Sequence, residues 1–240
     1  MCRLFASMRL EEAPTDRFGW LLAFFAQSRL HPDGWGMARF VDGQPQVIKE
    51  PEDASKSILL PRYLRWGKEP LLMAHIRQGS VGSNTMENTH PFLHNGWVFE
   101  HNGTFDALDR LKAKVSTPHL GELRGVTDSE VIFLLLLQGI KDADDPVEGI
   151  SETVRMLRTI KGPKTTALNF IMSDGQRLYL LNSAFIRADY YALHYLADED
   201  GRGMIFSSRP LDQNKGWTRL EKHTLLVVDR ELKSESYRLA

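Results

Sequence analysis

The chain has 240 residues, of which 42% are hydrophobic and 25% are charged, and its formal net charge is −1. This composition is typical of a globular protein with a large apolar core, and it argues against nucleic acid or an anionic membrane surface as the main partner. The single cysteine excludes an intramolecular disulfide framework and a cysteine-rich zinc site. The longest apolar stretches, residues 20–26 and 131–137, fall short of the roughly 20 residues that span a bilayer. We therefore expect one cytoplasmic domain over residues 1–240.

The first half of the chain mixes strand and helix signals. Pro14-Thr15-Asp16 predicts the start of a helix, and Asp42-Gly43 between two alternating segments predicts a hairpin. Residues 31–36 contain two glycines and a proline and are expected to form a loop. The predicted strands are 2–8, 37–41, 46–49, 71–77 and 97–101, and the predicted helices are 17–29, 54–66 (interrupted near Pro61) and 105–115.

The second half places two helices before a run of strands. Residues 127–130 have the spacing of a capping box and open a helix to about residue 140, while Asp145-Pro146 opens another to residue 160. Five further strands are predicted, with hairpin turns at 174–175 and 200–201: 165–173, 177–182, 190–196, 204–208 and 224–229. Strands at both ends of the chain, with helices between and outside them, predict an α+β fold with antiparallel sheets.

Cys2 is the candidate nucleophile. Removal of Met1, which a small side chain at position two generally permits, would leave a thiol and a free α-amine on one residue. A thiolate is a strong nucleophile, and a terminal amine with an ordinary pKa of about 7.7–8.0 can act as its base. A cysteine at this position also fits a small buried hydrophobic residue, so the assignment depends on the rest of the chain.

A cysteine that cleaves an amide also needs groups that hold its substrate. Asn102 and Gly103 can supply an oxyanion hole from a side-chain amide and a backbone N–H, although Asn-Gly is also a common turn. Arg77 can bind a carboxylate through two hydrogen bonds, and Asp128 can bind an ammonium group. A solvated strand end and an acid in the first turn of a helix are the alternatives for these two residues.

The histidines give no sign of a metal site. His75, His90 and His101 are 15 and 11 residues apart, which matches no compact ligand pattern. No glycine pattern for a nucleotide occurs, and no Gly-x-Ser-x-Gly motif for a serine triad is present. We therefore expect neither a metal nor another cofactor.

The order of these motifs resembles that of the class-II glutamine amidotransferases, which are N-terminal-nucleophile (Ntn) hydrolases. The resemblance covers about residues 1–230 and is carried by residues 1–6, 31–36, 74–78, 87–92, 101–103 and 127–130. Gln78 stands where the sugar- and nucleotide-building members carry Trp. This difference points to the stand-alone branch, which holds the YafJ-type proteins and γ-glutamyl hydrolases.

This resemblance implies a four-layer α/β/β/α sandwich of the Ntn-hydrolase type, with two antiparallel sheets and the nucleophile at the start of a central strand. It also implies a site that holds the α-amine and α-carboxylate of a glutamyl group. The expected site residues are the nucleophile Cys2, the oxyanion-hole residues Asn102 and Gly103, and the substrate-binding residues Arg77, Asp128, His75 and His90.

The expected reaction releases glutamate from glutamine or from another γ-glutamyl compound through a thioester on Cys2. Two alternatives stay open, namely a glutaminase subunit that passes ammonia to a separate synthetase and a non-catalytic binding protein that retains Met1. Related chains carry Ser-Glu-Pro-Leu where this one reads Ser208-Arg209-Pro210-Leu211, which leaves the leaving-group preference undecided. A homodimer is common among soluble enzymes and is compatible with this sequence.

Overall fold

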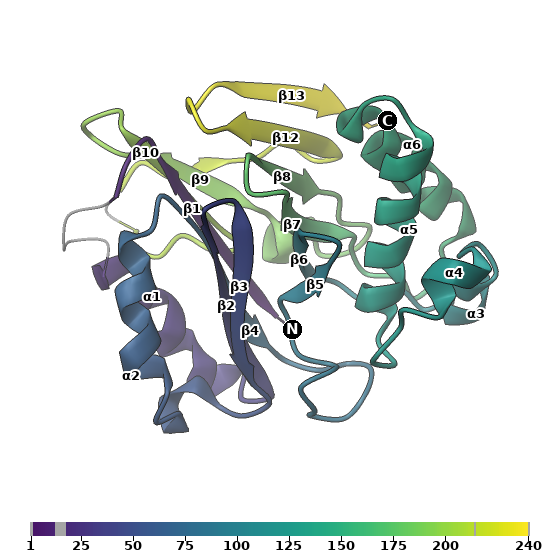
Figure 1. Cartoon of the computed structure of the whole chain (residues 1–240), viewed down its shortest axis with the longest axis horizontal. Helices are drawn as coiled ribbons and strands as arrows, with labels where there is room; N and C mark the ends of the chain where they lie inside the picture. The colour runs from purple at the N-terminus through teal and green to yellow at the C-terminus, as the bar shows by residue number, and fades with distance from the viewer. Residues whose placement is uncertain (1, 13–17, 214, 240) are drawn as a thin grey trace.

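The fold is built on two antiparallel β-sheets that face each other across a buried apolar layer. The computed structural model describes residues 2–12, 18–213 and 215–239 (Figure 1). Within these residues, the first sheet has seven strands in the order β11-β9-β10-β1-β4-β2-β3. They are β1 (Arg3–Arg9), β2 (Gly34–Val41), β3 (Gln44–Glu50), β4 (Leu71–Arg77), β9 (His194–Ala197), β10 (Gly203–Ser207) and β11 (Thr218–Arg219).

The second sheet has six strands over the same part of the chain, in the order β13-β12-β8-β7-β6-β5. They are β5 (Phe92–His94), β6 (Trp97–Asn102), β7 (Asn169–Ser173), β8 (Arg177–Asn182), β12 (Thr224–Asp229) and β13 (Ser234–Arg238). In the first sheet, β1 is a central strand: Phe5 pairs with Ser207 of β10 on one side and with Ala74 of β4 on the other. All seven residues of β1 are buried, so the residue that precedes it lies at the end of a rigid strand.

Helices cover the outer face of each sheet (Figure 1). The long helices α5 (Asp128–Asp142) and α6 (Pro146–Ile160) pack on the second sheet, and the short helices α3 (Leu108–Lys112) and α4 (Thr117–Leu120) pack against α5. Close contact between α5 and α6 requires glycine, because a Cβ at Gly139 would lie 2.1 Å from Thr153 Oγ1 and 2.8 Å from Gly149 O. The short helix α7 (Ala188–Tyr191) connects β8 to β9.

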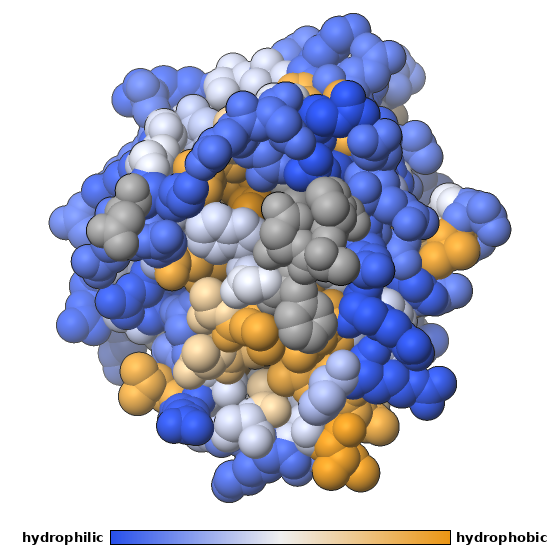
Figure 2. Space-filling model, turned by 90° about the vertical axis from the view of Figure 1, so that its left-hand side faces the viewer, coloured by the Kyte–Doolittle hydropathy of each residue, from blue (hydrophilic) through white to orange (hydrophobic). Residues whose placement is uncertain are grey.

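Short helices cover the first sheet: α1 (Phe18–Phe25), α2 (Leu60–Tyr63) and the 3₁₀ turns η2 (Ala26–Leu30), η3 (Ala54–Lys56) and η4 (Leu64–Lys68). Figure 2 faces this side and shows hydrophobic surface gathered over its middle and lower part, with hydrophilic surface around it. Large apolar residues of these elements and their connections stay exposed, namely Leu22, Leu30 and Ile58. Short elements thus bury the inner side chains Leu21 and Phe24 but leave their neighbours at the surface.

Three apolar layers hold the architecture together. One lies between the sheets and contains Leu4, Ala6 and Ile171, the second joins the second sheet to α5 and α6, and the third joins the first sheet to α1. Helix, sheet, sheet and helix therefore succeed one another, which confirms the predicted four-layer α/β/β/α arrangement. None of the described helices combines the length and apolarity needed to cross a membrane.

Several predicted boundaries were wrong for local reasons. The helix predicted at 105–115 is reduced to α3, because the Asp106 carboxylate accepts hydrogen bonds from Lys164 N and Thr165 Oγ1 and holds this stretch in a loop. The helix predicted at 54–66 is three short pieces, and Pro61 lies in the first turn of α2. The predicted loop 31–36 already belongs to β2 from Gly34 onward.

Other differences concern the sheet edges and the loops before them. The strand predicted at 190–196 begins only at His194, because Tyr190 and Tyr191 belong to α7. The edge strands β5, β11 and β13 were not predicted. The helix predicted at 17–29 is α-helical only at 18–25 and continues as a 3₁₀ turn, and its predicted start at Pro14-Thr15-Asp16 lies outside the described residues.

Candidate active site

Cys2 lies at the entrance to β1, between two neighbouring strands. The register that pairs Arg3 with Ile76 places Cys2 beside Arg77 at the end of β4. On the other side of β1, the Ser208 N–H donates to Leu4 O over 3.0 Å and holds the residues that follow β10. The half-buried Cys2 is a free thiol, and its Sγ donates to Gln78 O over 3.6 Å.

The charges around the thiol come from the residues predicted to bind the substrate. Burial raises the pKa of Cys2 above its ordinary value, and the Asp128 carboxylate raises it further. A backbone hydrogen bond with Gln78 and the Arg77 guanidinium oppose this rise. The fold therefore brings Arg77 and Asp128 within electrostatic range of Cys2. Since a raised pKa keeps the thiol protonated near neutral pH, a nucleophilic Cys2 needs a base to remove its proton.

Arg77 is only 2% exposed, and the segment 79–84 covers its guanidinium. Nη1 donates to Asp33 O over 3.4 Å and to Asn84 Oδ1 over 2.5 Å. Nη2 donates to Val81 O and to Gly82 O, each over 3.1 Å. A carboxylate that binds this guanidinium must displace some of these contacts, so the predicted role of Arg77 requires the segment 79–84 to shift when substrate enters.

The Asp33 carboxylate holds the same segment through two hydrogen bonds. Its Oδ2 accepts from Gly79 N over 2.9 Å, and its Oδ1 accepts from Asn84 Nδ2 over 3.1 Å. The segment 79–84 is therefore held at both ends by one carboxylate on the loop that opens β2.

Asn102 ends β6 on the face that looks toward β1. Residues 98, 100 and 102 share this face because side chains alternate along a strand, and Val98 packs in the same apolar layer as Leu4. The Asn102 side chain is fully buried, and neither atom of its amide has a hydrogen-bond partner among the described residues. A buried amide without partners is costly unless a bound molecule supplies them, which agrees with a role toward an oxyanion.

Gly103 follows at a position that no side chain could occupy. A Cβ there would lie 2.0 Å from Ala167 O and 2.9 Å from His101 Nε2. The absence of a side chain lets the backbone after Asn102 run close against residue 167. The oxyanion-hole role of Asn102 and Gly103 stays a prediction, and this close approach of the backbone is compatible with it.

Asp128 is the first residue of α5 and is 3% exposed. Its Oδ2 accepts from Phe105 N over 2.6 Å. Burial raises the pKa of Asp128 to about 6, against the opposing effect of backbone N–H groups. A carboxyl group that loses its proton near pH 6 presents a buried negative charge at neutral pH, which an ammonium group of the substrate can neutralise.

His75, His90 and His101 form a buried cluster beside these residues. The rings of His75 and His90 stack with centroids 4.2 Å apart, and His75 Nε2 donates to His101 O over 3.3 Å. His101 Nδ1 lies 2.9 Å from Ser129 Oγ on α5. Burial lowers the pKa of His75 to about 3, that of His101 to about 4 and that of His90 well below its ordinary value. All three imidazoles are therefore neutral at pH 7 and join β4, β6 and α5 around the site.

No metal centre emerges from this cluster. Nowhere in the described residues do three His, Cys, Asp or Glu side chains gather so that they could hold a metal ion. His75 and His90 are 0% and 3% exposed. A substrate could therefore touch either ring only after it has entered the site. The His75 ring lies between β4 and β6 and stacks on His90, which fits a supporting position better than a direct one.

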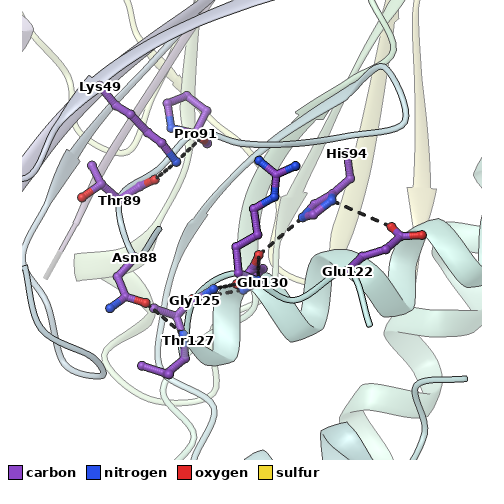
Figure 3. A network of polar contacts seen from close by, with 11 residues as sticks. Lys49, Asn88, Thr89, Pro91, His94, Glu122, Gly125, Thr127 and Glu130 are labelled. Carbon is purple, nitrogen blue, oxygen red and sulfur yellow. Dashed lines mark hydrogen bonds and ion pairs between the residues drawn. The ribbon is translucent and has the colours of Figure 1, made fainter. Parts of the chain in front are cut away.

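A polar network beside the site fixes the segment that carries His90. Figure 3 shows Lys49 of β3 pointing at the carbonyls of Thr89 and Pro91, with distances of 2.6 and 3.4 Å. Burial lowers the pKa of Lys49 to about 8. Asn88 Oδ1 accepts from Val126 N over 2.9 Å, which ties this segment to the loop before α5.

The same network organises the loop that leads into Asp128. Glu130 Oε1 accepts from Arg124 N over 3.0 Å, and Oε2 accepts from Gly125 N over 2.7 Å. His94 lies between Glu130 and Glu122, at 3.4 and 3.9 Å (Figure 3). The predicted capping box is therefore half present: Thr127 Oγ1 accepts from Glu130 N, while the Glu130 carboxylate turns to the preceding loop.

Replacing Glu130 by Ala should lower the free energy of unfolding by about 2–4 kcal/mol, because it leaves two N–H groups of the loop without their charged acceptor. Urea denaturation measures this loss. The matched control is Glu122→Ala, whose half-exposed side chain lies 3.9 Å from His94 and should cost less than about 1 kcal/mol. Equal losses in the two variants would show that Glu130 does not hold this loop.

Two residues near the thiol were missed as site residues. Gln78 offers its carbonyl to Cys2, and its Oε1 lies 3.2 Å from His31 Nδ1. Burial, followed by the Arg3 guanidinium, lowers the pKa of His31 to about 4. Both residues lie in motifs noted in the sequence, but their contact joins positions 47 residues apart, and no local pattern reports such a pairing.

Known proteins resemble this chain in sequence and in fold. The family model for class-II glutamine amidotransferases matches residues 1–235. The chain belongs to this family. A protein of Methanocaldococcus jannaschii is 32% identical over 86% of this class-II chain, which spans 64% of that relative's length. The Escherichia coli protein YafJ, whose name assigns it to the glutamine amidotransferases, is 32% identical over 79% of this chain and 82% of its own.

Solved structures show the same class-II fold. A glutamine aminotransferase class-II domain protein of Silicibacter pomeroyi superposes with a TM-score of 0.74 at 21% identity, over 100% of this chain and 99% of its own. The glutamine phosphoribosylpyrophosphate amidotransferase of B. subtilis has a TM-score of 0.71 at 18% identity, over 100% of this chain and 49% of its own. The two-sheet α+β architecture predicted from the sequence is therefore confirmed as that of this family.

Proposed function

We propose that this chain hydrolyses the γ-amide bond of glutamine or of another γ-glutamyl compound through a covalent intermediate on Cys2. The observation that carries the proposal is the convergence of four groups around the start of β1. A free thiol lies there within electrostatic range of a buried Arg77 and a buried Asp128, and Asn102 of the facing sheet has an amide without partners. A nucleophile, an oxyanion donor and two opposite charges are what a glutamyl amide requires.

The proposed reaction has two steps. After removal of Met1, the Cys2 amine accepts the thiol proton, the sulfur attacks the γ-carbonyl carbon, and Asn102 and Gly103 bind the oxyanion. The C–N bond then breaks, the leaving nitrogen takes the proton, and a γ-glutamyl thioester remains. Water attacks this thioester, which releases glutamate and restores the thiol. Arg77 holds the α-carboxylate after the segment 79–84 has shifted, and Asp128 holds the α-amine.

The test is release of glutamate from L-glutamine and from γ-glutamyl-p-nitroanilide by the purified chain. L-asparagine is the matched control, since its shorter side chain cannot reach Cys2 while its amino acid end stays bound to Arg77 and Asp128. We expect turnover of the glutamyl compounds and none of L-asparagine. Absence of glutamate release from both glutamyl compounds would contradict the proposal.

A further inference from the structure

Arg3 lies on the face of β1 opposite to Cys2, because side chains alternate along a strand. It pairs with Ile76 of β4 and shares its face with Phe5, and both of these residues pack in the apolar layer under α1. Arg3 also lines a cavity of about 330 Å³. The described residues around this cavity are Arg3, Asp189, Tyr190, His194, Ser208, Arg209 and Pro210. Cys2 is not one of them, so the cavity is separate from the candidate active site.

The Arg3 side chain is buried without a carboxylate beside it. The residue is 6% exposed, and its Nε has no hydrogen-bond partner among the described residues. The guanidinium donates to Tyr190 Oη over 3.5 Å and lies 5.1 Å from the centroid of that ring. A buried guanidinium is costly unless an anion compensates its charge, and a tyrosine hydroxyl supplies no such charge.

Arg209 brings a second guanidinium to the same cavity. Phe5 pairs with Ser207 where β1 and β10 run antiparallel, and the Ser208 N–H donates to Leu4 O over 3.0 Å. Continued by two residues, this register places Arg209 opposite Arg3. Like charges opposite each other destabilise a sheet. Neither arginine has an ion pair in the described part of the chain, so an anion bound between them would remove this repulsion.

A third guanidinium approaches from the start of α7. Arg187 precedes this helix in the left-handed region, with a φ of 48°, and its guanidinium lies 5.8 Å from the centroid of Tyr190. Side chains rarely adopt this backbone conformation, and such strain often occurs at functional sites. The one carboxylate of the cavity wall, Asp189, is already paired with Arg219 over 2.5 Å. The wall therefore carries more positive charge than its own acid neutralises.

Neutral groups of the wall can donate further hydrogen bonds. His194 Nδ1 is buried and has no partner among the described residues. Ser208 Oγ accepts from Leu4 N over 3.1 Å, and Tyr190 Oη accepts from Arg3, so each hydroxyl still has its own proton to donate. Two guanidinium groups and these neutral donors exceed what the two oxygens of a carboxylate can accept, but they suit the oxygens of a phosphate group.

We propose that this cavity binds a phosphate group, supplied by free phosphate or by a small phosphate monoester, at a site separate from the active site. The bound group lies between Arg3 and Arg209, with the neutral donors of the wall around it. It joins the start of β1, the residues after β10 and the short helix α7. Because Arg3 directly follows Cys2, occupancy of this site fixes the strand end from which the proposed nucleophile projects. The inference concerns binding alone and does not depend on the proposed hydrolysis.

Isothermal titration calorimetry of the full chain near neutral pH tests the site with inorganic phosphate, with glycerol 3-phosphate and, as a small carboxylate, with acetate. Sodium chloride keeps the ionic strength constant. We expect the phosphate compounds to bind with a Kd of about 1 mM or lower, and acetate to bind at least about tenfold more weakly. Binding of glycerol 3-phosphate assigns the site to a monoester, and binding of inorganic phosphate alone assigns it to free phosphate.

Two variants of the cavity wall show whether binding occurs there. Arg3→Gln should weaken phosphate binding by at least about tenfold, and Arg209→Gln, at an exposed position, by about threefold. The matched control is Arg155→Gln on α6, an exposed arginine without an ion pair among the described residues, which should keep the wild-type Kd. Thermal unfolding verifies that each variant is folded, and Arg209→Gln decides if Arg3→Gln is not.

Three results would overturn the inference. The first is that neither phosphate compound binds to the wild-type chain. The second is that acetate binds as tightly as phosphate, which would indicate a carboxylate site. The third is that folded variants at Arg3 and Arg209 bind phosphate with the wild-type Kd, which would place the bound anion elsewhere on the molecule.

Discussion

Replacing Cys2 by Ala should reduce glutamate release by at least about 10⁴-fold, because it removes the thiol that forms the proposed thioester. The fold should survive the change. Among the described residues, the thiol has a single hydrogen bond, the 3.6 Å contact with Gln78 O, so the free energy of unfolding should change by less than about 1 kcal/mol. Glutamate assays and thermal unfolding on the same preparation measure the two quantities.

Cys2→Ser is the control for this result. Serine is as small as cysteine, so removal of Met1 remains permitted, but its hydroxyl is a far weaker nucleophile at neutral pH. We expect Cys2→Ser to be almost as inactive as Cys2→Ala. Near-wild-type turnover in a folded Cys2→Ala protein would rule out the thioester mechanism.

Replacing Asp128 by Asn should lower kcat/KM for L-glutamine by about 100-fold or more at pH 8, because it removes the buried charge that faces the substrate ammonium. The variant should also alter the pH dependence. In the wild type, Asp128 takes up a proton as the pH falls through about 6 and can then no longer pair with the ammonium group. Below that pH, kcat/KM should lose an additional factor of about ten per pH unit.

The pH profile distinguishes this role from a merely structural one. In Asp128→Asn no proton binds at this position, so the additional loss below pH 6 should disappear. Glu122→Gln, which changes a half-exposed acid beside His94, should keep the wild-type profile. An Asp128→Asn profile that still bends near pH 6, or an unchanged kcat/KM at pH 8, would exclude the assigned contact with the substrate.

The parts of the site that lie at the ends of strands and helices could be predicted because their signals are local. An apolar, strand-like segment that ends at Arg77 predicted β4, a further strand signal predicted β6, and the spacing of residues 127–130 predicted the start of α5. Cys2 at the start of a strand followed from the alternation of residues 2–8. Each of these predictions required only neighbours along the chain.

The parts that could not be predicted depend on contacts between distant segments. Nothing local indicates that residues 79–84 cover Arg77, because the acceptors are backbone carbonyls, which every sequence has. The same applies to the close approach of Gly103 to residue 167. Tyr190 and Tyr191 favour a strand by propensity, but Arg187 in the left-handed region starts a helical turn there. That turn packs Tyr191 against Ala167 and Ala184, a contact that emerged only from the fold.

The most direct test is the intact mass of the purified protein before and after treatment with 6-diazo-5-oxo-L-norleucine, a glutamine analogue that alkylates a nucleophile in a glutamyl site with loss of dinitrogen. We predict a chain that begins at Cys2 and gains a single adduct, which the Cys2→Ala variant does not form. A chain that retains Met1 and gains no adduct would contradict an N-terminal cysteine nucleophile and favour a binding protein instead.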